Sequence, residues 1–373
     1  MPRSRECEDT LVAQSFGART LGQFRNMRVV VIGATGNVGS SVVDALSRQD
    51  RVSEIVGVAR RVPETVVSKT RFVAADIARD DLVPLFRDAD AVVHLAWFFQ
   101  PTHQPMITWR NNVVGSERVF DAVERAGVPA LVYASSVGAY SPGPDVPVDE
   151  SWPTHSVPTA GYGREKAYVE RLLDAFEARH ESTRVVRFRP AFLFKWVAAS
   201  EQRRIFAGPF VPGSLARAVP VLPYPRGLRF QALHTDDAAE AYCRAVTSDV
   251  RGAFNLAAEP IVTGPVLAEV MGARLVEVPP IVVRAGLATA WHLRASPAEP
   301  TLFDLVMAAP LLDSTRARVE LSWEPRVSAV DALTELVEGM AAGAGGASRP
   351  LERDGFRARL REVAAGVGSR VAS

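Results

Sequence analysis

The sequence is poor in cysteine and histidine. Its 373 residues include only two cysteines, Cys7 and Cys243, which lie far apart and lack the spacing of metal ligands. This excludes a disulfide framework and fits a reducing compartment, so we expect a cytoplasmic protein. The six histidines are scattered singly, so no metal site is expected.

Long apolar runs are also missing. The most apolar candidate, residues 281–291, is interrupted by Arg284 and is too short to span a bilayer. The first 26 residues lack the apolar centre of a signal peptide and are typical of a disordered leader, with Met27 as an alternative start directly before the first expected strand. No membrane partner is therefore expected.

Charge of one sign is not in excess. The formal net charge is +1 and no long basic stripe occurs, so nucleic acid is not expected as a partner. Apolar residues, in contrast, make up 47% of the chain. That share is enough to build a full core in one large domain or two smaller ones.

Short β-branched runs alternate with helical patterns from Arg28 onwards. Expected strands cover residues 28–32, 54–59, 71–77, 91–96, 130–136 and 183–189. Expected helices cover residues 37–49, 112–127 and 162–177. The strands are continuously apolar rather than alternating, which indicates a parallel sheet buried on both faces. We therefore predict an α/β fold with a doubly wound parallel sheet.

The regular alternation ends after Pro190. Residues 189–215 are rich in aromatic residues, proline and glycine, and a returning strand is expected at 254–259. We predict a sheet domain, a smaller irregular lobe over the carboxyl ends of the strands, and a flexible linker with an arginine-rich tail. These parts cover residues 27–190 (completed by about 230–260), 191–229 with 261–338, and 339–373.

Three glycines stand at the turn from the first strand to the first helix, in VVVIGATGNVGSSVV. Glycine at such a turn permits unusual backbone angles, close approach to a pyrophosphate, and close packing of helix on sheet. Free N–H groups at the helix start would hold the phosphates. An ordinary tight turn is the weaker alternative, because the motif follows a strand and opens a helix. The predicted dinucleotide contacts are Gly33, Thr35, Gly36, Asn37, Val38 and Gly39.

The second expected strand ends without a carboxylate. Ala59 is followed by Arg60 and Arg61, whereas an enzyme that prefers NAD carries a carboxylate there for the ribose 2′-hydroxyl. An arginine at this point can pair bidentately with a 2′-phosphate. Two solvated arginines on a loop are the alternative interpretation. We expect NADP as the cofactor, with NAD as the alternative.

Two further motifs extend this pattern: YASSVGAY at the end of the fifth strand and YGREK at 162–166. With the glycine loop they resemble the extended branch of the short-chain dehydrogenase/reductase superfamily, the NAD-dependent epimerase/dehydratase family. The resemblance covers residues 28–339 and implies a Rossmann-type fold and an NAD(P)-dependent enzyme. It is supported by NVVGS (112–116), VDESWP (148–153), HTDDAAEAY (234–242) and DSTRARVELSWEP (313–325).

The spacing within YGREK has two interpretations. A tyrosine and a lysine at i, i+4 can be a plain surface pair on a helix. The resemblance instead implies that Tyr162 is the catalytic acid/base, whose ordinary pKa of about 10 is lowered by Lys166 and the positive nicotinamide ring. Lys166 would also bind the nicotinamide ribose. The family's serine, counted back from Tyr140, is Ser136, which would hold the substrate oxygen; Ser135 ranks second.

The resemblance also implies roles for further residues of this sequence. Residues at strand ends are implied to line the cofactor: Asp76 and Ile77 at the adenine, Leu95 and Ala96 along the phosphate and ribose, and Pro190 at the nicotinamide. Asn112 resembles the family's structural asparagine on the helix beside the site. For Asp237 and Glu170, structural roles are favoured over catalytic ones.

One position departs from the family pattern. Sugar-nucleotide members usually carry an arginine shortly before the H-x-x-D stretch, where it holds the substrate pyrophosphate. Aligned on His234 and Asp237, this position holds Phe230, and the neighbouring Arg229 would point elsewhere on a strand. Arg203 and Arg204 could still contact an anionic substrate, so a nucleotide sugar stays open.

Aromatic residues follow both the fourth and the sixth expected strand. These clusters are Trp97, Phe98 and Phe99, and Phe192, Phe194 and Trp196. Core packing is the ordinary role of such clusters, but both leave the carboxyl ends of strands, where ligands bind. We expect an apolar or aromatic small-molecule substrate, contacted by Trp97, Phe98, Ser135 and Phe192.

Three functions follow as hypotheses. The first is an NADP-preferring oxidoreductase that acts on a ketone or secondary alcohol. The second is a nucleotide-sugar epimerase or dehydratase, which would use the same triad but retain its cofactor. The third is a non-catalytic dinucleotide sensor, disfavoured by the intact triad. A homodimer is left open.

Overall fold

The computed structural model describes residues 26–100 and 102–369. Its centre is a seven-stranded sheet in which every neighbouring pair of strands is parallel. The predicted doubly wound α/β fold is confirmed. In spatial order the strands are β10 (Gly252–Leu256), β6 (Arg184–Pro190), β5 (Ala130–Ala134), β4 (Ala91–His94), β1 (Met27–Ile32), β2 (Val52–Ala59) and β3 (Thr70–Ala74).

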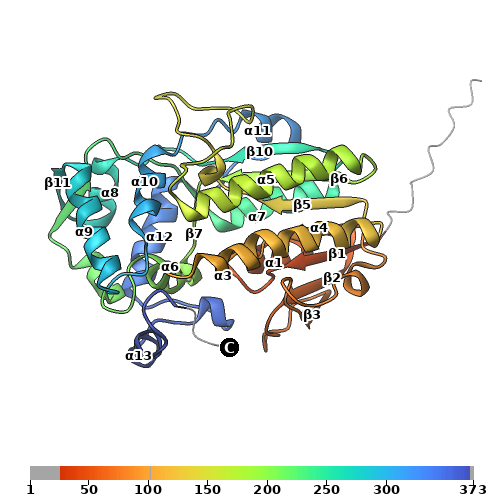
Figure 1. The fold of residues 1–373 in the computed structure, drawn as a ribbon, viewed down its shortest axis with the longest axis horizontal. Coiled ribbons are helices and arrows are strands. Elements are labelled where there is room, and N and C mark those ends of the chain that lie inside the picture. Colours follow the sequence, from red (N-terminus) through yellow and green to blue (C-terminus); the bar gives the residue numbers. More distant parts are fainter. Residues whose placement is uncertain (1–25, 101, 370–373) are drawn as a thin grey trace, which may run out of the picture.

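Helices cover both faces of this sheet (Figure 1). On one face, α2 (Val83–Phe86), α4 (Gly115–Arg125) and α5 (Gly161–Arg179) pack their apolar residues on the strands. On the other face lie α1 (Asn37–Ser47), α7 (Thr235–Thr247) and α11 (Thr315–Leu321). Burial on both faces explains why the strand sequences are continuously apolar.

One predicted helix begins earlier than expected. The sequence pattern predicted residues 112–127, whereas the helical segment starts with α3 (Pro105–Trp109), passes through a π-helical turn (Arg110–Val114) and continues as α4. Pro105 occupies the first helical position, where its missing N–H costs no hydrogen bond. The π turn contains Asn112, whose side chain is important for the site.

The smaller lobe lies beside the carboxyl ends of the strands (Figure 1). Residues 189–215, for which no element was predicted, contain β7 (Phe192–Phe194) and α6 (Ala199–Phe206). β7 pairs with β9 (Ala232–His234), and β8 (Val221–Pro225) pairs with β11 (Arg274–Val278). The helices of the lobe also include α8 (Gly264–Met271), α9 (Pro280–His292), α10 (Pro300–Ala308) and α12 (Ala329–Ala341).

The chain continues beyond the lobe to residue 369. The segment predicted as linker and tail contains the end of α12, a 3-10 turn (Arg349–Leu351) and α13 (Phe356–Ala365). Leu351 and Val367 are buried. The predicted leader, residues 1–26, lies outside the described residues except for its last position.

Candidate active site

The loop between β1 and α1 requires two of its glycines. Gly33 has a positive φ of 84°, and a Cβ there would lie 2.8 Å from the backbone nitrogen of Ala96. A Cβ on Gly39 would lie 2.0 Å from the Gly33 carbonyl oxygen. At Gly36, in contrast, a Cβ would have only that carbonyl nearby, at 3.5 Å. The loop is therefore tightly closed on the sheet side and open beside Gly36, which suits close approach of a pyrophosphate to the start of α1.

The first residues of α1 are tied to the neighbouring elements. The Asn37 side-chain amide donates to the Leu193 carbonyl at 3.4 Å and accepts from the Thr235 hydroxyl at 3.2 Å. The buried Lys195 ammonium donates to the Asn37 carbonyl at 2.7 Å, and burial lowers the pKa of Lys195 to about 8. Sequence reasoning missed Lys195. Its nearness to the helix start depends on how β7 packs, which no local motif reveals.

The predicted adenine end lies at the ends of β2 and β3. The Arg60 guanidinium lies over the Phe98 ring, 4.5 Å from the centroid, and is close enough to Asp76 to interact with its charge. Arg61 is exposed. The Asp76 carboxylate accepts from the Ala78 N–H at 2.9 Å. The structure therefore brings Arg60 next to the predicted adenine-side residues.

The loop after β4 lies directly beside the glycine loop. Leu95 donates its N–H to the Ile32 carbonyl at 2.9 Å, and Ala96 lies against Gly33. Asn112 fixes the next residues, because its side chain accepts from the Phe98 N–H at 2.7 Å and donates to the Phe98 carbonyl at 2.8 Å. These two hydrogen bonds fix the backbone of the loop and therefore the directions of its aromatic side chains.

Tyr162 and Ser136 meet at the carboxyl end of β5. Tyr162 lies in the first turn of α5, and the Ser136 hydroxyl lies close enough to its phenol to affect the pKa of that group. Burial raises the pKa of Tyr162 to about 12, and Ser136 opposes that rise. Ser135 points elsewhere and donates to a Glu170 carboxylate oxygen at 2.6 Å. Of the two serine candidates, Ser136 therefore lies at the tyrosine, whereas Ser135 is bound to Glu170.

Lys166 lies one turn further along α5, beneath an aromatic ring. Its ammonium donates to the Ala134 carbonyl at 2.6 Å and lies 3.5 Å from the centroid of the Trp97 indole. Burial lowers the pKa of Lys166 well below its usual range, and Glu170 and Glu165 oppose this. The Trp97 ring also meets the edge of Tyr162, with centroids 6.0 Å apart. Trp97, predicted as a substrate contact, thus links the two residues of the YGREK motif.

A cavity of about 250 Å³ opens beside Tyr162. Phe99 stacks on the tyrosine ring at 4.9 Å between centroids. Of the predicted substrate contacts, Phe98 lines this cavity. Phe192 packs instead on Phe230 in the smaller lobe, with centroids 5.4 Å apart. The lining is Phe98, Phe99, Thr102, Pro105, Met106, Thr108, Trp109, Gly161, Tyr162, Arg164, Glu165, Glu299 and Leu302.

Glu165, which sequence reasoning did not single out, is a buried wall residue of this cavity. It accepts from the Thr108 hydroxyl and from the Asn112 amide, both at 2.6 Å. Burial raises its pKa, and these two hydrogen bonds oppose the rise. Its position next to Lys166 in the motif was the available signal. Glu165 joins the α3–α4 segment to the helix that carries Tyr162.

Three arginines near the lobe are already bound to protein groups. Arg203 is 2% exposed and pairs with Glu362 at 2.6 Å. Arg204 donates to the Pro350 carbonyl. Arg229 pairs with Asp145 at 2.7 Å. Arg203 and Arg204, which could have held an anionic substrate, and Arg229, which was expected to point elsewhere, each have a partner within the chain.

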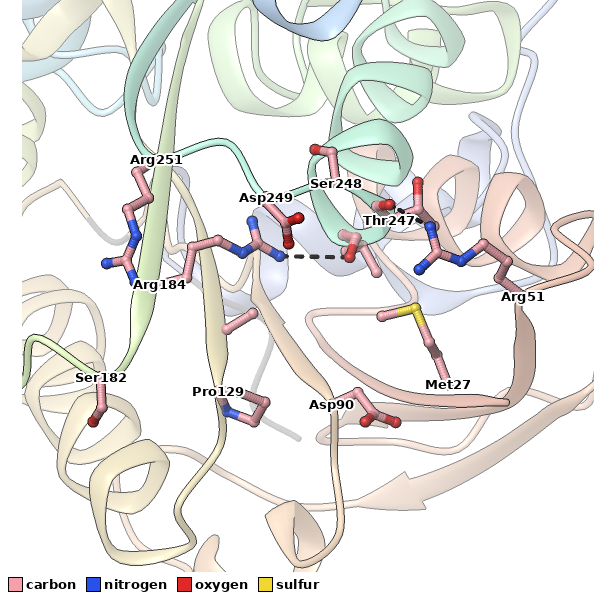
Figure 2. A pocket seen from close by; sticks show the side chains of 12 residues that line it. Met27, Arg51, Asp90, Pro129, Ser182, Arg184, Thr247, Ser248, Asp249 and Arg251 are labelled. Atoms are coloured by element: carbon pink, nitrogen blue, oxygen red, sulfur yellow. Dashed lines mark hydrogen bonds between the residues drawn. The ribbon is translucent and has the colours of Figure 1, made fainter. Parts of the chain in front are cut away.

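A larger cavity of about 500 Å³ lies at the opposite, amino end of the strands (Figure 2). Arg51 donates to the Thr247 carbonyl at 2.7 Å, and Arg184 donates to the Ala245 carbonyl at 2.9 Å, at the end of α7. Arg251 lines the same cavity. Arg51 and Arg184 bind carbonyls at the end of α7, whereas Arg251 binds the Glu181 and Thr183 carbonyls before β6. None of the predicted site residues lies here.

Neither a metal cluster nor a membrane-spanning helix occurs in the part of the chain that the structure describes. No group of three or more histidine, cysteine, aspartate or glutamate residues there could hold a metal ion. Within the same residues, every helix is too short or too polar to cross a bilayer.

Sequence relatives lie at moderate identity. An uncharacterised protein of Mycobacterium bovis is 26% identical over 324 residues, which cover 83% of each chain. A UDP-glucose 4-epimerase of Azospirillum brasilense is 31% identical over 162 residues, 41% of this chain and 45% of the epimerase.

Two solved structures share the fold. A UDP-glucose 4-epimerase from Stenotrophomonas maltophila, with bound NAD and formylated UDP-arabinopyranose, has a TM-score of 0.64 at 20% identity, over 85% of this chain and 98% of that one. A UDP-glucose 4-epimerase from Thermotoga maritima, with UDP-glucose, has a TM-score of 0.63 at 22% identity, over 85% and 99%. At these identities the likeness shows the Rossmann-type fold.

The family is shown by a broader match. The sequence profile described as the NAD dependent epimerase/dehydratase family matches residues 29–257. This range includes the glycine loop, the YGREK motif and the seven-stranded sheet except for the first two residues of β1. The resemblance inferred from these motifs is therefore confirmed, and the chain belongs to the NAD-dependent epimerase/dehydratase family.

Proposed function

We propose that the protein is an NADP-preferring oxidoreductase that transfers a hydride at the ketone or secondary alcohol of an apolar or aromatic small molecule. The observation that carries this proposal is the position of Tyr162. The Ser136 hydroxyl lies beside its phenol, and Tyr162 lines a cavity to which Phe98, Phe99 and Trp109 also contribute. Membership of the family makes the protein an NAD-dependent type of enzyme, and the site residues suggest the chemistry.

The proposed mechanism divides the work between three side chains. A nicotinamide cofactor, when bound, would supply or accept the hydride. In the reducing direction, Tyr162 donates its phenolic proton to the substrate oxygen as negative charge develops there, and Ser136 donates a hydrogen bond to the same oxygen. The charge of Lys166 stabilises the phenolate that remains. In the oxidising direction, the phenolate accepts the proton from the alcohol.

The apolar part of the cavity wall favours an uncharged substrate. Phe99, Trp109 and Met106 line the cavity beside Tyr162, together with the charged residues Arg164, Glu165 and Glu299. Arg203, Arg204 and Arg229 are engaged by other parts of the chain, as described above. A substrate pyrophosphate would have to compete with these contacts, and separating a buried arginine from its carboxylate is costly. An apolar or aromatic carbonyl compound has no such requirement.

The end of β2 supports NADP. Arg60 and Arg61 follow the strand, and Ala59 stands where an NAD enzyme carries a carboxylate. Arg60 is held over Phe98 beside the loop that follows β4. NAD is the alternative cofactor, since a solved structure of the same fold contains it.

A nucleotide-sugar epimerase is the second candidate. It is favoured by the relatives and solved structures named as UDP-glucose 4-epimerases. Such an enzyme would use Ser136, Tyr162 and Lys166 in the same roles, but it would return the hydride to its substrate and retain the cofactor.

Cofactor turnover separates the two candidates. The purified protein is mixed with NADPH or NADH and with panels of aromatic ketones, aliphatic ketones and UDP-sugars, and absorbance of the reduced cofactor is followed. Steady consumption of NADPH with a ketone supports the oxidoreductase. Conversion of a UDP-sugar without net consumption of reduced cofactor would overturn it in favour of the epimerase.

A further inference from the structure

The last part of the chain contacts both the glycine loop and the loop that follows β4. The Ser348 hydroxyl donates to the Thr35 carbonyl at 2.7 Å, and Thr35 belongs to the glycine loop. Twenty residues later, Gly368 packs near Pro297 and Thr102, so that a Cβ on it would lie 3.6 Å from the Thr102 hydroxyl oxygen. Thr102 follows β4. The two contacts fall on the loops after β1 and β4, which are neighbours in the sheet.

We name residues 343–369 the C-terminal strap. Between its two end contacts, the strap is anchored on α6. The buried Arg203 guanidinium of α6 pairs with Glu362 at 2.6 Å and with Asp354 at 3.4 Å. Ser200, also on α6, donates to the Ala344 carbonyl and accepts from the Asp354 N–H. Two buried charges that partner each other hold a geometry tightly, because separating them leaves a charge unpaired in the interior.

Helix α6, on which the strap is anchored, is also linked to Tyr162 by a series of contacts. Gln100, in the loop after β4, donates to the Arg204 and Ile205 carbonyls at 3.4 and 3.3 Å. Phe206, at the end of α6, meets the edge of Phe99, with centroids 6.3 Å apart. Phe99 in turn stacks on Tyr162. A continuous row of contacts therefore runs from the strap through α6 to the candidate acid/base.

We propose that the C-terminal strap is a positioning element that closes over the dinucleotide site, held shut by Ser348 on the glycine loop and by Glu362 on Arg203. The strap contacts join protein groups to one another. Entry and exit of the cofactor then both require the strap to lift. The inference rests on dinucleotide binding alone, and it holds whether the enzyme is an oxidoreductase or an epimerase.

The test measures binding kinetics without any substrate, so it does not depend on the proposed reaction. Stopped-flow fluorescence of NADPH gives the association and dissociation rate constants for the full-length protein and for Ser348→Ala. Loss of one neutral hydrogen bond raises the population of the open strap about two- to tenfold. Both rate constants should rise by this factor, and Kd should change by less than about threefold, because opening precedes entry and exit alike.

A stronger variant and a matched control complete the experiment. Deletion of residues 343–373 together with Arg203→Met removes the strap without leaving a buried unpaired charge. This variant should raise both rate constants more than tenfold, which corresponds to an activation barrier lowered by more than about 1.4 kcal/mol. Glu352→Gln is the control, since it removes a strap ion pair with Arg361 that is exposed and contacts neither loop. The control should bind NADPH as the wild type does.

Two results would overturn the proposal. In the first, both variants bind and release NADPH at wild-type rates while circular dichroism shows them folded. In the second, the dissociation rate constant rises while the association rate constant stays constant, which would make the strap a support for bound cofactor rather than a gate. An unfolded deletion variant would leave Ser348→Ala to decide between these outcomes.

Discussion

The ring of Phe99 lies flat on the ring of Tyr162, with centroids 4.9 Å apart and an angle of 11° between the planes. Trp97 closes a second side of the same tyrosine, edge-on at 6.0 Å. Phe99 itself is 37% exposed, so it separates the tyrosine from solvent at the mouth of the cavity. This arrangement turns an aromatic cluster of the sequence into a wall around the proposed acid/base.

Replacing Phe99 by alanine should therefore lower kcat/KM most for apolar substrates. The substitution removes a stacked ring, and such pairs contribute about 0.5–1.5 kcal/mol beyond their buried area. We expect kcat/KM for an aromatic ketone to fall about tenfold, mainly through KM. Phe99→Leu, which keeps an apolar wall, should lose less. Equal kcat/KM values for wild type and Phe99→Ala, with any ketone that turns over, would show that Phe99 is not part of the substrate wall.

Tyr162→Phe tests the proposed acid/base directly. The phenol contributes proton transfer, which is typically worth about 10²–10⁴-fold in rate. The expected role of the phenol is proton transfer rather than phosphate binding, so cofactor affinity should stay nearly unchanged. Turnover is measured with the best substrate of the panel, and Kd by NADPH fluorescence. Near-normal turnover in this variant would remove Tyr162 from the mechanism.

Lys166→Met should weaken both rate and cofactor binding. Methionine preserves an unbranched apolar chain beneath Trp97 but removes the ammonium that donates to the Ala134 carbonyl. We expect kcat to fall and the Kd for NADPH to rise, because one side chain serves the tyrosine and the ribose. The pH–rate profile should also move to higher pH, since the phenolate loses a stabilising charge.

The control for Lys166 lies on the same helix. Arg179→Met removes an exposed cation near the end of α5, away from the cavity residues. It should leave kcat, Kd and the pH profile unchanged. If Lys166→Met behaves in the same way as Arg179→Met, the YGREK spacing is only a structural pair.

Cofactor choice should follow the residues after β2. Charge-assisted hydrogen bonds from Arg60 and Arg61 to a 2′-phosphate contribute roughly 1.5–3 kcal/mol each at best, and solvent and salt reduce this. We expect a preference for NADPH over NADH, measured as the ratio of kcat/KM values at fixed ionic strength. Replacing both arginines by alanine, together with Ala59→Asp, should move the ratio towards NADH. A wild type that already prefers NADH would show that these arginines serve another purpose.

Glu170→Gln should destabilise the fold at neutral pH. Glu170 is fully buried and pairs with Arg189 and Arg187, both at 2.9 Å. Breaking a buried ion pair by removing one partner costs about 3–5 kcal/mol. Urea unfolding measures this loss. Asp174→Asn, which removes a half-exposed partner of Arg187, should cost less than about 1 kcal/mol.

The same carboxylate predicts how stability depends on pH. Burial raises the pKa of Glu170, but the hydrogen bond and charge of Arg189 and the charge of Arg187 outweigh this and lower it to about 2. The folded pKa lies below the unfolded value of about 4.3, so the stabilisation is present above that value and is lost as the pH falls towards about 2. Wild type should therefore approach Glu170→Gln in stability between these limits. A difference that stays constant over this range would contradict the ion pair.

Much of the cofactor half of the site could be predicted from local sequence. Continuous apolar strands can be buried only in a parallel sheet covered on both faces, and such a sheet brings the ends of neighbouring strands to one edge. Gly33 and Gly39 were recognisable for the same reason, because the turn between β1 and α1 leaves no room for a Cβ. The positions of Tyr162 and Lys166 on one helix followed from their spacing alone.

The tertiary structure decided which side chains of each motif face the site. Ser136 rather than Ser135 contacts Tyr162, because Glu170 on α5 binds Ser135. Asn112 holds the backbone of Phe98, and the neighbouring Phe99 stacks on the tyrosine. These choices depend on hydrogen bonds between residues that lie far apart in the chain, so no local pattern could make them.

Arg203 is the clearest example of a residue whose role could not be predicted from the sequence. In the sequence it is a cation that could bind an anionic substrate, whereas in the structure it is buried against Glu362, 159 residues further on. The sequence gives no partner for Arg203, because the glycine- and alanine-rich stretch up to residue 350 is typical of a linker and the tail after it is rich in arginine. Burial and pairing of a charge are properties of the packed chain. The sequence by itself determined the family and the chemistry available to it, and only the tertiary structure decided which charges remain free for a ligand.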